Sequence, residues 1–376
     1  MRHHHAAAAL VLVVALSSCS GADEAETDAP RPAATSTSSA GASASPSDPA
    51  ADPTTDPTTE PTDPGAEPDD GPAPEVEPAP EVSVLGLGEQ RHRGDRLRLG
   101  AVREETAAYT SYDVTYRSRS STRTGPESFT ISGVLNVPKG RGPFPAVVLA
   151  HGYIDPAVYV RGQGMTRERG YLASRGYLAL HVDYRNHAES SDDPDYQLRM
   201  RLGYSADVIN AVNALRATDD VPVADDRIAL FGRSMGGGVV LKTLIAAPGL
   251  VQAAAPWASV SSLEAQNFDQ FQRDDPADDP RTRALAERWG LPEDNPRFWR
   301  RNSSRPYVDR ITEPVLLVHG RFDDTCPPGW ARATQRALRS AGVDSRLQWY
   351  DDGHAFGPAF TAAMDRTIAF FRAQGV

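Results

Sequence analysis

One short motif carries the strongest chemical signal in this sequence. Residues 232–236 read Gly-Arg-Ser-Met-Gly, which places a glycine two residues before and two residues after Ser234. This spacing is typical of a sharp turn between a strand and a helix, because small residues on both sides let the backbone fold tightly and leave the hydroxyl exposed. The helix that begins there also directs its free N–H groups toward the same point. The motif therefore predicts Ser234 as a nucleophile.

A serine hydroxyl is a weak nucleophile near neutral pH, so it needs a general base, and the base needs a carboxylate that orients it. Both follow later in the chain, each just after an apolar segment. Asp323 follows the segment at 315–318, and His354 lies in a glycine-containing loop after the segment at 346–350. The order serine, aspartate, histidine is the order expected for the α/β-hydrolase fold. These residues are therefore the predicted catalytic triad.

Other acids and histidines compete for these roles. Asp324 is the main alternative to Asp323 as the acid, and Asp351 and Asp352 are further ones. His151 and His319 each precede a glycine at a predicted strand end, where packing of the turn is the expected role. His92, His181 and His187 are expected to be structural or solvated.

A serine attack turns the substrate carbonyl into an oxyanion, which two N–H donors stabilise. The residue after the nucleophile supplies one of them, here the backbone N–H of Met235. The other comes from the loop after an earlier strand. His-Gly-Tyr at 151–153 predicts the backbone N–H of Tyr153, to within one residue, as that donor.

The surrounding sequence indicates the elements that position these residues. Residues 108–116 and 128–135 alternate between apolar and polar side chains, as β-strands do. After them, short apolar segments alternate with helical ones. The predicted strands are 146–150, 178–182, 228–231, 315–318 and 346–350, and the predicted helices are 204–215, 235–246, 330–340 and 359–372. This alternation predicts an α/β fold with a mostly parallel central sheet, helices on both faces and antiparallel strands at its N-terminal side.

The chain also resembles a known superfamily between about residues 144 and 372. The residues that carry the resemblance are His-Gly at 151–152, Gly-Tyr at 176–177, Asp-Tyr-Arg at 183–185, 232–237, Asn-Pro at 295–296, 314–320 and 323–327. They resemble the α/β-hydrolase superfamily, and more narrowly the catalytic domain of prolyl-oligopeptidase-type and dienelactone-hydrolase-like serine hydrolases. In that pattern the catalytic acid stands three residues after His-Gly and four before proline, which is Asp323.

Two departures from the family pattern bear on the substrate. Cys326 stands where valine is usual, which is expected to change packing only. Before Tyr109 there is no room for the gating propeller that restricts prolyl oligopeptidases to peptides. The resemblance therefore implies a serine hydrolase of ester or peptide bonds without a cofactor, and the missing propeller favours a carboxylesterase over a peptidase.

An insertion at 261–312 separates the strand that ends near Trp257 from the strand at 315–318. It contains Phe268, Phe271, Trp289, Phe298 and Trp299 among many charges. We expect its helices to form a cap over the mouth of the site. The alternative is a surface excursion in which the acidic residues around 274–279 neutralise the arginines at 297–305.

The N-terminal segments predict export. Residues 1–18 read as a lipoprotein signal peptide, because the apolar run at 6–16 follows a positive start and is too short to span a bilayer. The run ends in Leu-Ser-Ser-Cys, which resembles a bacterial lipobox and makes Cys19 the expected lipidation site. Residues 19–82, rich in proline, threonine and alanine, are expected to be a disordered acidic tether, and residues 83–376 the catalytic domain.

Charge and cysteine content exclude several classes of function. The formal net charge is −11, but residues 20–80 alone hold 14 acidic side chains and one basic side chain. The remaining chain is nearly neutral, so no basic surface that binds nucleic acid is predicted. The two cysteines, Cys19 and Cys326, are too few for a disulfide scaffold or a cysteine-rich zinc site. No metal or cofactor is expected.

Together these features predict a serine hydrolase on the outer face of a bacterial membrane, or a secreted one if Cys19 carries no lipid. Its expected partners are a small ester or peptide substrate and the membrane that holds the anchor. Three alternatives stay open: a prolyl-oligopeptidase-type peptidase, a lipase that acts on its own membrane, and a tethered binding module without catalysis. The sequence gives no indication of an oligomeric state.

Overall fold

The computed structural model describes residues 80–273 and 280–376. The predicted signal peptide, the lipidation site Cys19 and the tether up to residue 79 lie outside these residues. The helices in the described ranges are all too short or too polar to cross a membrane.

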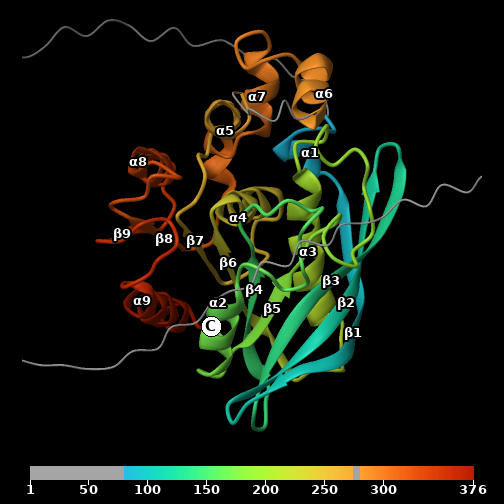
Figure 1. The fold of residues 1–376 in the computed structure, drawn as a ribbon, viewed down its shortest axis with the longest axis vertical. Coiled ribbons are helices and arrows are strands. Elements are labelled where there is room, and N and C mark those ends of the chain that lie inside the picture. The colour runs from blue at the N-terminus through green and yellow to red at the C-terminus, as the bar shows by residue number, and fades with distance from the viewer. Residues whose placement is uncertain (1–79, 274–279) are drawn as a thin grey trace, which may run out of the picture. The chain divides into compact units, whose positions relative to one another are not determined.

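A nine-stranded sheet with the order β1-β2-β3-β5-β4-β6-β7-β8-β9 organises the described chain (Figure 1). The first three strands are antiparallel, and β3 also pairs antiparallel with β5; from β5 to β9 all neighbours are parallel. The strands are β1 (Arg91–Glu105), β2 (Tyr109–Thr122), β3 (Gly125–Pro138), β4 (Phe144–Ala150), β5 (Leu178–Val182), β6 (Val223–Arg233), β7 (Ala253–Trp257), β8 (Val315–Gly320) and β9 (Ser345–Tyr350). The predicted α/β-hydrolase fold is confirmed.

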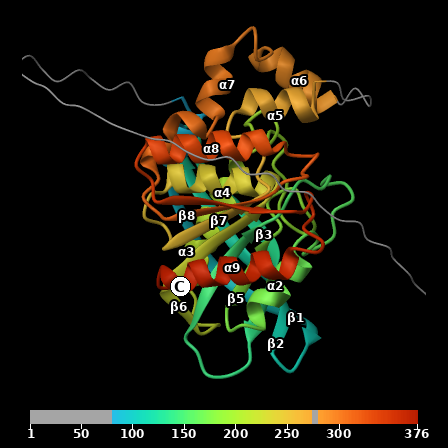
Figure 2. The same ribbon diagram turned by 90° about the vertical axis from the view of Figure 1, so that its left-hand side faces the viewer.

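Helices cover both faces of the parallel part of the sheet (Figure 2). One face packs against α3 (Leu202–Arg216), α4 (Met235–Ala246) and α8 (Pro328–Ser340), and the other against α2 (Thr166–Ala173) and α9 (Phe360–Ala373). The short helix α1 (Val84–Gly88) contacts α3 and α4. A sheet covered in this way buries both faces of its central strands, which explains why those strands read as continuous apolar runs.

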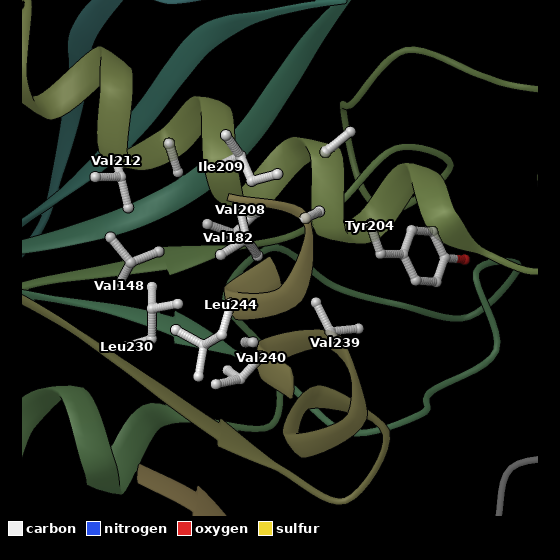
Figure 3. Packing of buried hydrophobic residues seen from close by; sticks show 14 of the residues in the cluster. Val148, Val182, Tyr204, Val208, Ile209, Val212, Leu230, Val239, Val240 and Leu244 are labelled. Carbon is white, nitrogen blue, oxygen red and sulfur yellow. The ribbon is translucent and has the colours of Figure 1, made fainter. Parts of the chain in front are cut away.

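The core between the sheet and the first helical face consists mainly of aliphatic side chains (Figure 3). Val148, Val182 and Leu230 of three neighbouring strands are fully buried. Ile209 of α3 and Leu244 of α4 pack against them. This core fixes the strands and the two helices that border the predicted site.

All the predicted strands and helices are present, with ends that differ by a few residues. Helix α1, strand β1 and helix α2 were not predicted from the sequence. Strand β1 is exposed over most of its length and has no apolar alternation to reveal it. Helix α2 buries Glu168 and Arg169 together with Leu172, so its charged residues hide its packing face from a reading of hydrophobicity.

The insertion forms a helical layer rather than an irregular excursion. It contains α5 (Glu264–Phe271), α6 (Pro280–Trp289), α7 (Pro296–Asn302) and a 3-10 helix at Arg305–Arg310. Its aromatic side chains pack on one another: the ring centroids of Trp289 and Phe298 lie 4.6 Å apart, and those of Phe268 and Trp299 lie 4.8 Å apart. The acidic residues at 274–279 lie outside the described ranges.

Two glycines of the 232–236 motif allow the close approach of β4, β6 and α4. A methyl group on Gly236 would collide with the Ala150 carbonyl and lie 2.7 Å from the His151 carbonyl oxygen. A methyl group on Gly232 would collide with the Gly236 carbonyl. Glycine is therefore required here by lack of space, because neither residue has a positive φ.

We expect Gly236→Ala to lower the free energy of unfolding by about 1–3 kcal/mol, because the added methyl group forces α4 away from β4. Urea denaturation of the full chain measures this change. Gly329→Ala is the matched control, since Gly329 lies in α8 with no atom near its added methyl group. The control should be neutral or slightly stabilising, and an equal loss in both variants would contradict the explanation.

Candidate active site

The nucleophile candidate Ser234 occupies the turn between β6 and α4. Its backbone has φ 59° and ψ −123°, a conformation that residues other than glycine rarely adopt. The Ser234 N–H donates to the Trp257 carbonyl at 3.0 Å, and the Gly237 N–H donates to the Ser234 carbonyl at 3.0 Å. These bonds hold the strained turn, which is the geometry that the glycine spacing predicts.

The structure brings His354 and Asp323 together. Nδ1 of His354 lies 3.0 Å from Oδ1 and 2.9 Å from Oδ2 of Asp323. The Asp323 side chain is fully buried, whereas His354 is 22% exposed. The backbone N–H groups of Thr325 and Cys326 donate to Asp323 Oδ1 at 3.1 and 2.8 Å. A buried carboxylate that is fixed in this way can orient the imidazole and stabilise its protonated form.

The competing acids lie elsewhere. Asp324 is exposed and accepts one bond from the Thr325 hydroxyl at 3.3 Å, and Asp351 is exposed and pairs with Arg321 at 2.9 Å. Asp352 accepts backbone N–H bonds from three residues of its own loop. Burial acts to raise the pKa of Asp352, but these N–H groups hold it below its ordinary value. Asp352 thus shapes the loop that carries His354 without contacting its ring.

Ser234 and His354 line one cavity of about 470 Å³. Its walls come from α3, α4 and the insertion, with Tyr204, Val239 and Leu285 among the lining residues. Helices of the insertion thus form part of the wall of the cavity that contains Ser234.

The two predicted oxyanion donors belong to segments that border Ser234. Met235 is the first residue of α4, so its N–H has no acceptor within the helix. The loop after β4 passes close to the nucleophile, because a methyl group on Gly152 would lie 3.2 Å from Cβ and 3.8 Å from Oγ of Ser234. The side chain of Tyr153, the next residue, lines the same cavity.

The buried side chain of His151 holds the loop after β4 in place. Its Nδ1 lies 2.6 Å from the Gly152 carbonyl oxygen and its Nε2 lies 3.2 Å from that of Asp183. Burial lowers the pKa of His151 to about 3, so the ring is neutral near neutral pH and holds the loop with the one N–H that it carries. This agrees with the structural role expected from the sequence.

Two buried side chains, His319 and Cys326, support the loop after β8 that carries Asp323. Nε2 of the buried His319 lies 2.9 Å from the Cys326 carbonyl oxygen and 3.4 Å from Asp323 Oδ2. Burial lowers the pKa of His319. Cys326 is fully buried, and burial followed by the charge of Asp323 raises the pKa of its thiol to about 12, against an opposing hydrogen bond with Ser234. The thiol thus stays protonated near neutral pH.

A set of charged residues that the sequence analysis did not single out holds the histidine loop. Arg167 of α2 donates to the carbonyl oxygens of Ala355 and Phe356 at 2.8 and 3.1 Å. Arg233 pairs with Glu168 of α2 at 3.0 Å and also reaches the Ala355 carbonyl at 3.4 Å. The sequence pattern did not reveal these charged residues, because their roles depend on the position of α2, which was not predicted.

Within residues 80–273 and 280–376, no group of three or more histidine, cysteine or acidic side chains is arranged as a metal site. The expected lipidation site, Cys19, lies outside those ranges.

Comparison with known proteins places the chain among enzymes of two activities. It is 29% identical to dipeptidyl peptidase 4 of Felis catus over 198 residues, which are 50% of this chain and 24% of that peptidase. It is 32% identical to esterase EstD of Thermotoga maritima over 122 residues, which are 30% of this chain and 28% of the esterase. The chain thus spans only about a quarter of the length of these relatives.

Among solved structures, the acetyl xylan esterase of Paenibacillus sp. R4 superposes with a TM-score of 0.56 at 22% identity, over 79% of this chain and 96% of the esterase. This likeness shows the shared α/β-hydrolase fold. The model of the prolyl oligopeptidase family matches residues 164–374, more than half of the chain and the part that holds Ser234, Asp323 and His354. The chain therefore belongs to the prolyl oligopeptidase family.

Proposed function

We propose that this protein is a serine hydrolase that cleaves an ester or peptide bond through an acyl-enzyme. The observation that carries the proposal is the pair formed by His354 and the buried Asp323, on the same cavity as the strained Ser234. A nucleophile, a base and an orienting acid on one cavity are what acyl transfer requires.

The roles follow from the contacts. Because Asp323 binds Nδ1 of His354, Nε2 is the nitrogen left to take the Ser234 proton as Oγ attacks the substrate carbonyl. The resulting oxyanion is stabilised by the N–H groups of Met235 and Tyr153. His354 then gives its proton to the leaving alcohol or amine. The acyl group of the substrate remains as an ester on Oγ of Ser234. A water molecule, deprotonated by His354, attacks that ester and releases the acid.

The substrate is proposed to be an ester, with a peptide bond as the alternative. An esterase and an acetyl xylan esterase are among the proteins similar to this chain, which supports an ester substrate. The similarity to dipeptidyl peptidase 4 supports the peptidase alternative. Comparable turnover of blocked peptide amides and of esters would favour that alternative.

We also propose that the enzyme is exported and lipid-anchored through Cys19. The support is the sequence: an apolar segment of signal-peptide length, a lipobox-like end and a long acidic segment before the catalytic part. Two acyl chains would hold it stably on a membrane, where a single chain is marginal. Radiolabelled palmitate incorporation that persists in Cys19→Ser would contradict this proposal.

The first test is labelling by a fluorophosphonate. We expect the full chain to be labelled, and Ser234→Ala to lose both labelling and ester turnover by roughly 10⁴- to 10⁶-fold, because the nucleophile is removed. Ser174→Ala, at the exposed end of α2, is the control and should behave as the wild type. A wild type that is not labelled would support the non-catalytic binding module instead.

The second test separates the two candidate acids. Asp323→Asn should lower kcat by roughly 10⁴-fold, because the amide no longer selects the productive tautomer of His354. Asp324→Asn should change kcat by less than about threefold, since Asp324 is exposed and does not contact the ring. Steady-state kinetics on one soluble ester compares them, and the reverse ranking would move the acid to Asp324.

The third test concerns the support of the histidine loop by α2. Glu168→Gln removes the charge that pairs with Arg233 while keeping nearly the same shape, so we expect kcat to fall about 10- to 100-fold as His354 loses its fixed position, with KM little changed. Glu189→Gln, which breaks an exposed ion pair with Arg161, is the matched control. An unchanged kcat in Glu168→Gln would show that Arg167 alone suffices to hold the loop.

A further inference from the structure

Arg201 lies in the wall of the cavity that contains Ser234. Its Nε donates to Gln197 Oε1 at 2.8 Å, its Nη1 lies 3.7 Å from the Met235 sulfur, and its guanidinium carbon lies 5.0 Å from the centroid of the Tyr153 ring. The guanidinium therefore stands beside both residues that are proposed to bind the oxyanion. It was not singled out in the sequence, where nothing distinguishes it from the arginines around it.

The charge of Arg201 is not neutralised by any residue that the structure describes. Of the other charged side chains on the cavity wall, Lys242 and Glu264 pair with each other at 2.9 Å. No carboxylate in the described ranges forms an ion pair with Arg201, and its Nη2 has no protein partner there. A half-buried cation that has no counter-ion among the described residues is unfavourable unless a ligand supplies the opposite charge.

The backbone of this segment is strained in a way that presents the side chain. Met200 has φ 54° and Arg201 has φ 53°, two consecutive non-glycine residues in the left-handed region. Each such residue costs on the order of 1–3 kcal/mol unless its surroundings impose the conformation. Met200 is 8% exposed and lines the cavity, and Arg201 is the N-cap residue of α3. Strain of this kind is typical of residues that bind ligands.

We propose that Arg201 binds a carboxylate of the substrate, so that this enzyme acts preferentially on anionic esters. This inference rests on the proposed serine hydrolase function. A guanidinium presents its N–H groups in a planar fork that matches a carboxylate, and charge-assisted bonds of this type are stronger than neutral ones. Gln197 accepts a hydrogen bond from Nε, which orients the guanidinium and leaves Nη2 without a protein partner among the described residues. This carboxylate belongs either to the acyl part of the substrate or to its leaving group. The experiment below tests each possibility with its own pair of esters.

The test compares matched anionic and neutral esters on the full chain. In the acyl arm, the 4-nitrophenyl monoester of adipic acid is compared with 4-nitrophenyl hexanoate; in the leaving-group arm, 4-acetoxybenzoate is compared with 4-acetoxybenzamide. The wild type should prefer the anionic ester in one arm. Arg201→Gln should lower that ratio of kcat/KM values about 10- to 100-fold, with kcat/KM for the neutral ester changed by less than about threefold.

Arg199→Gln is the matched control. Arg199 belongs to the same segment, pairs with Glu127 and does not line the cavity, so the ratio should stay at the wild-type value. Arg201→Lys keeps the charge without the fork and should restore part of the preference. Thermal unfolding followed by circular dichroism confirms that each variant is folded.

Two results would overturn the inference. One is a wild type that turns over neutral esters but shows no anionic preference in either arm. The other is an Arg201→Gln variant that loses the same factor on both members of a pair, which would make Arg201 a stabiliser of the oxyanion or of the fold.

A binding measurement separates this inference from the proposed function. Isothermal titration of Ser234→Ala with monomethyl adipate and with dimethyl adipate needs no turnover. Tighter binding of the monoester that disappears when Arg201→Gln is added supports the recognition even if the wild type is not labelled by fluorophosphonate. Equal binding of the two ligands contradicts it even if the wild type is labelled.

Discussion

The backbone of Ser234 is held in a conformation that a serine does not adopt by itself. The cost is of the order of 1–3 kcal/mol, and the surrounding hydrogen bonds and packing must impose it. The Trp257 carbonyl and the first turn of α4 supply the bonds. Gly232 and Gly236 supply the space, because any side chain there would strike neighbouring backbone. Because the Ser234 hydroxyl is fixed at this position, the other residues of the site must be positioned around it by their own loops.

The parallel sheet makes that convergence possible. The carboxyl ends of parallel strands meet at one edge of the sheet, so a loop after each strand can contribute one group. The loop after β4 carries Tyr153, Ser234 directly follows β6, the loop after β8 carries Asp323 and the loop after β9 carries His354. None of these four loops contains the whole site. Helix α2 then fixes the loop of His354 through a bond between segments far apart in the chain, and the buried His151 and His319 fix their loops through bonds to nearby residues.

The residues that line the cavity come from two different kinds of element. The residues proposed for the chemistry stand at strand ends, whereas many of those that would meet the rest of a substrate stand on α3 and on the insertion. Such walls can change without disturbing the strained turn, which is the physical reason why one fold serves both esterases and peptidases. Arg201 is an example, since its proposed role in substrate binding depends on its place in the cavity wall and not on the triad.

The sequence by itself determined the class of fold and the nucleophile, because alternation of apolar segments and the spacing of two glycines are local properties that one stretch of chain fully specifies. It also indicated Asp323 and His354, since each follows a strand in the order that the fold requires. Only the tertiary structure decided that Asp323 rather than Asp324 touches His354, that β1 and α2 exist, and that Arg201 has no counter-ion in the described chain. Each of these depends on which distant segments come into contact: Arg167 and Ala355, for example, are 188 residues apart in the chain and joined by a hydrogen bond in the fold.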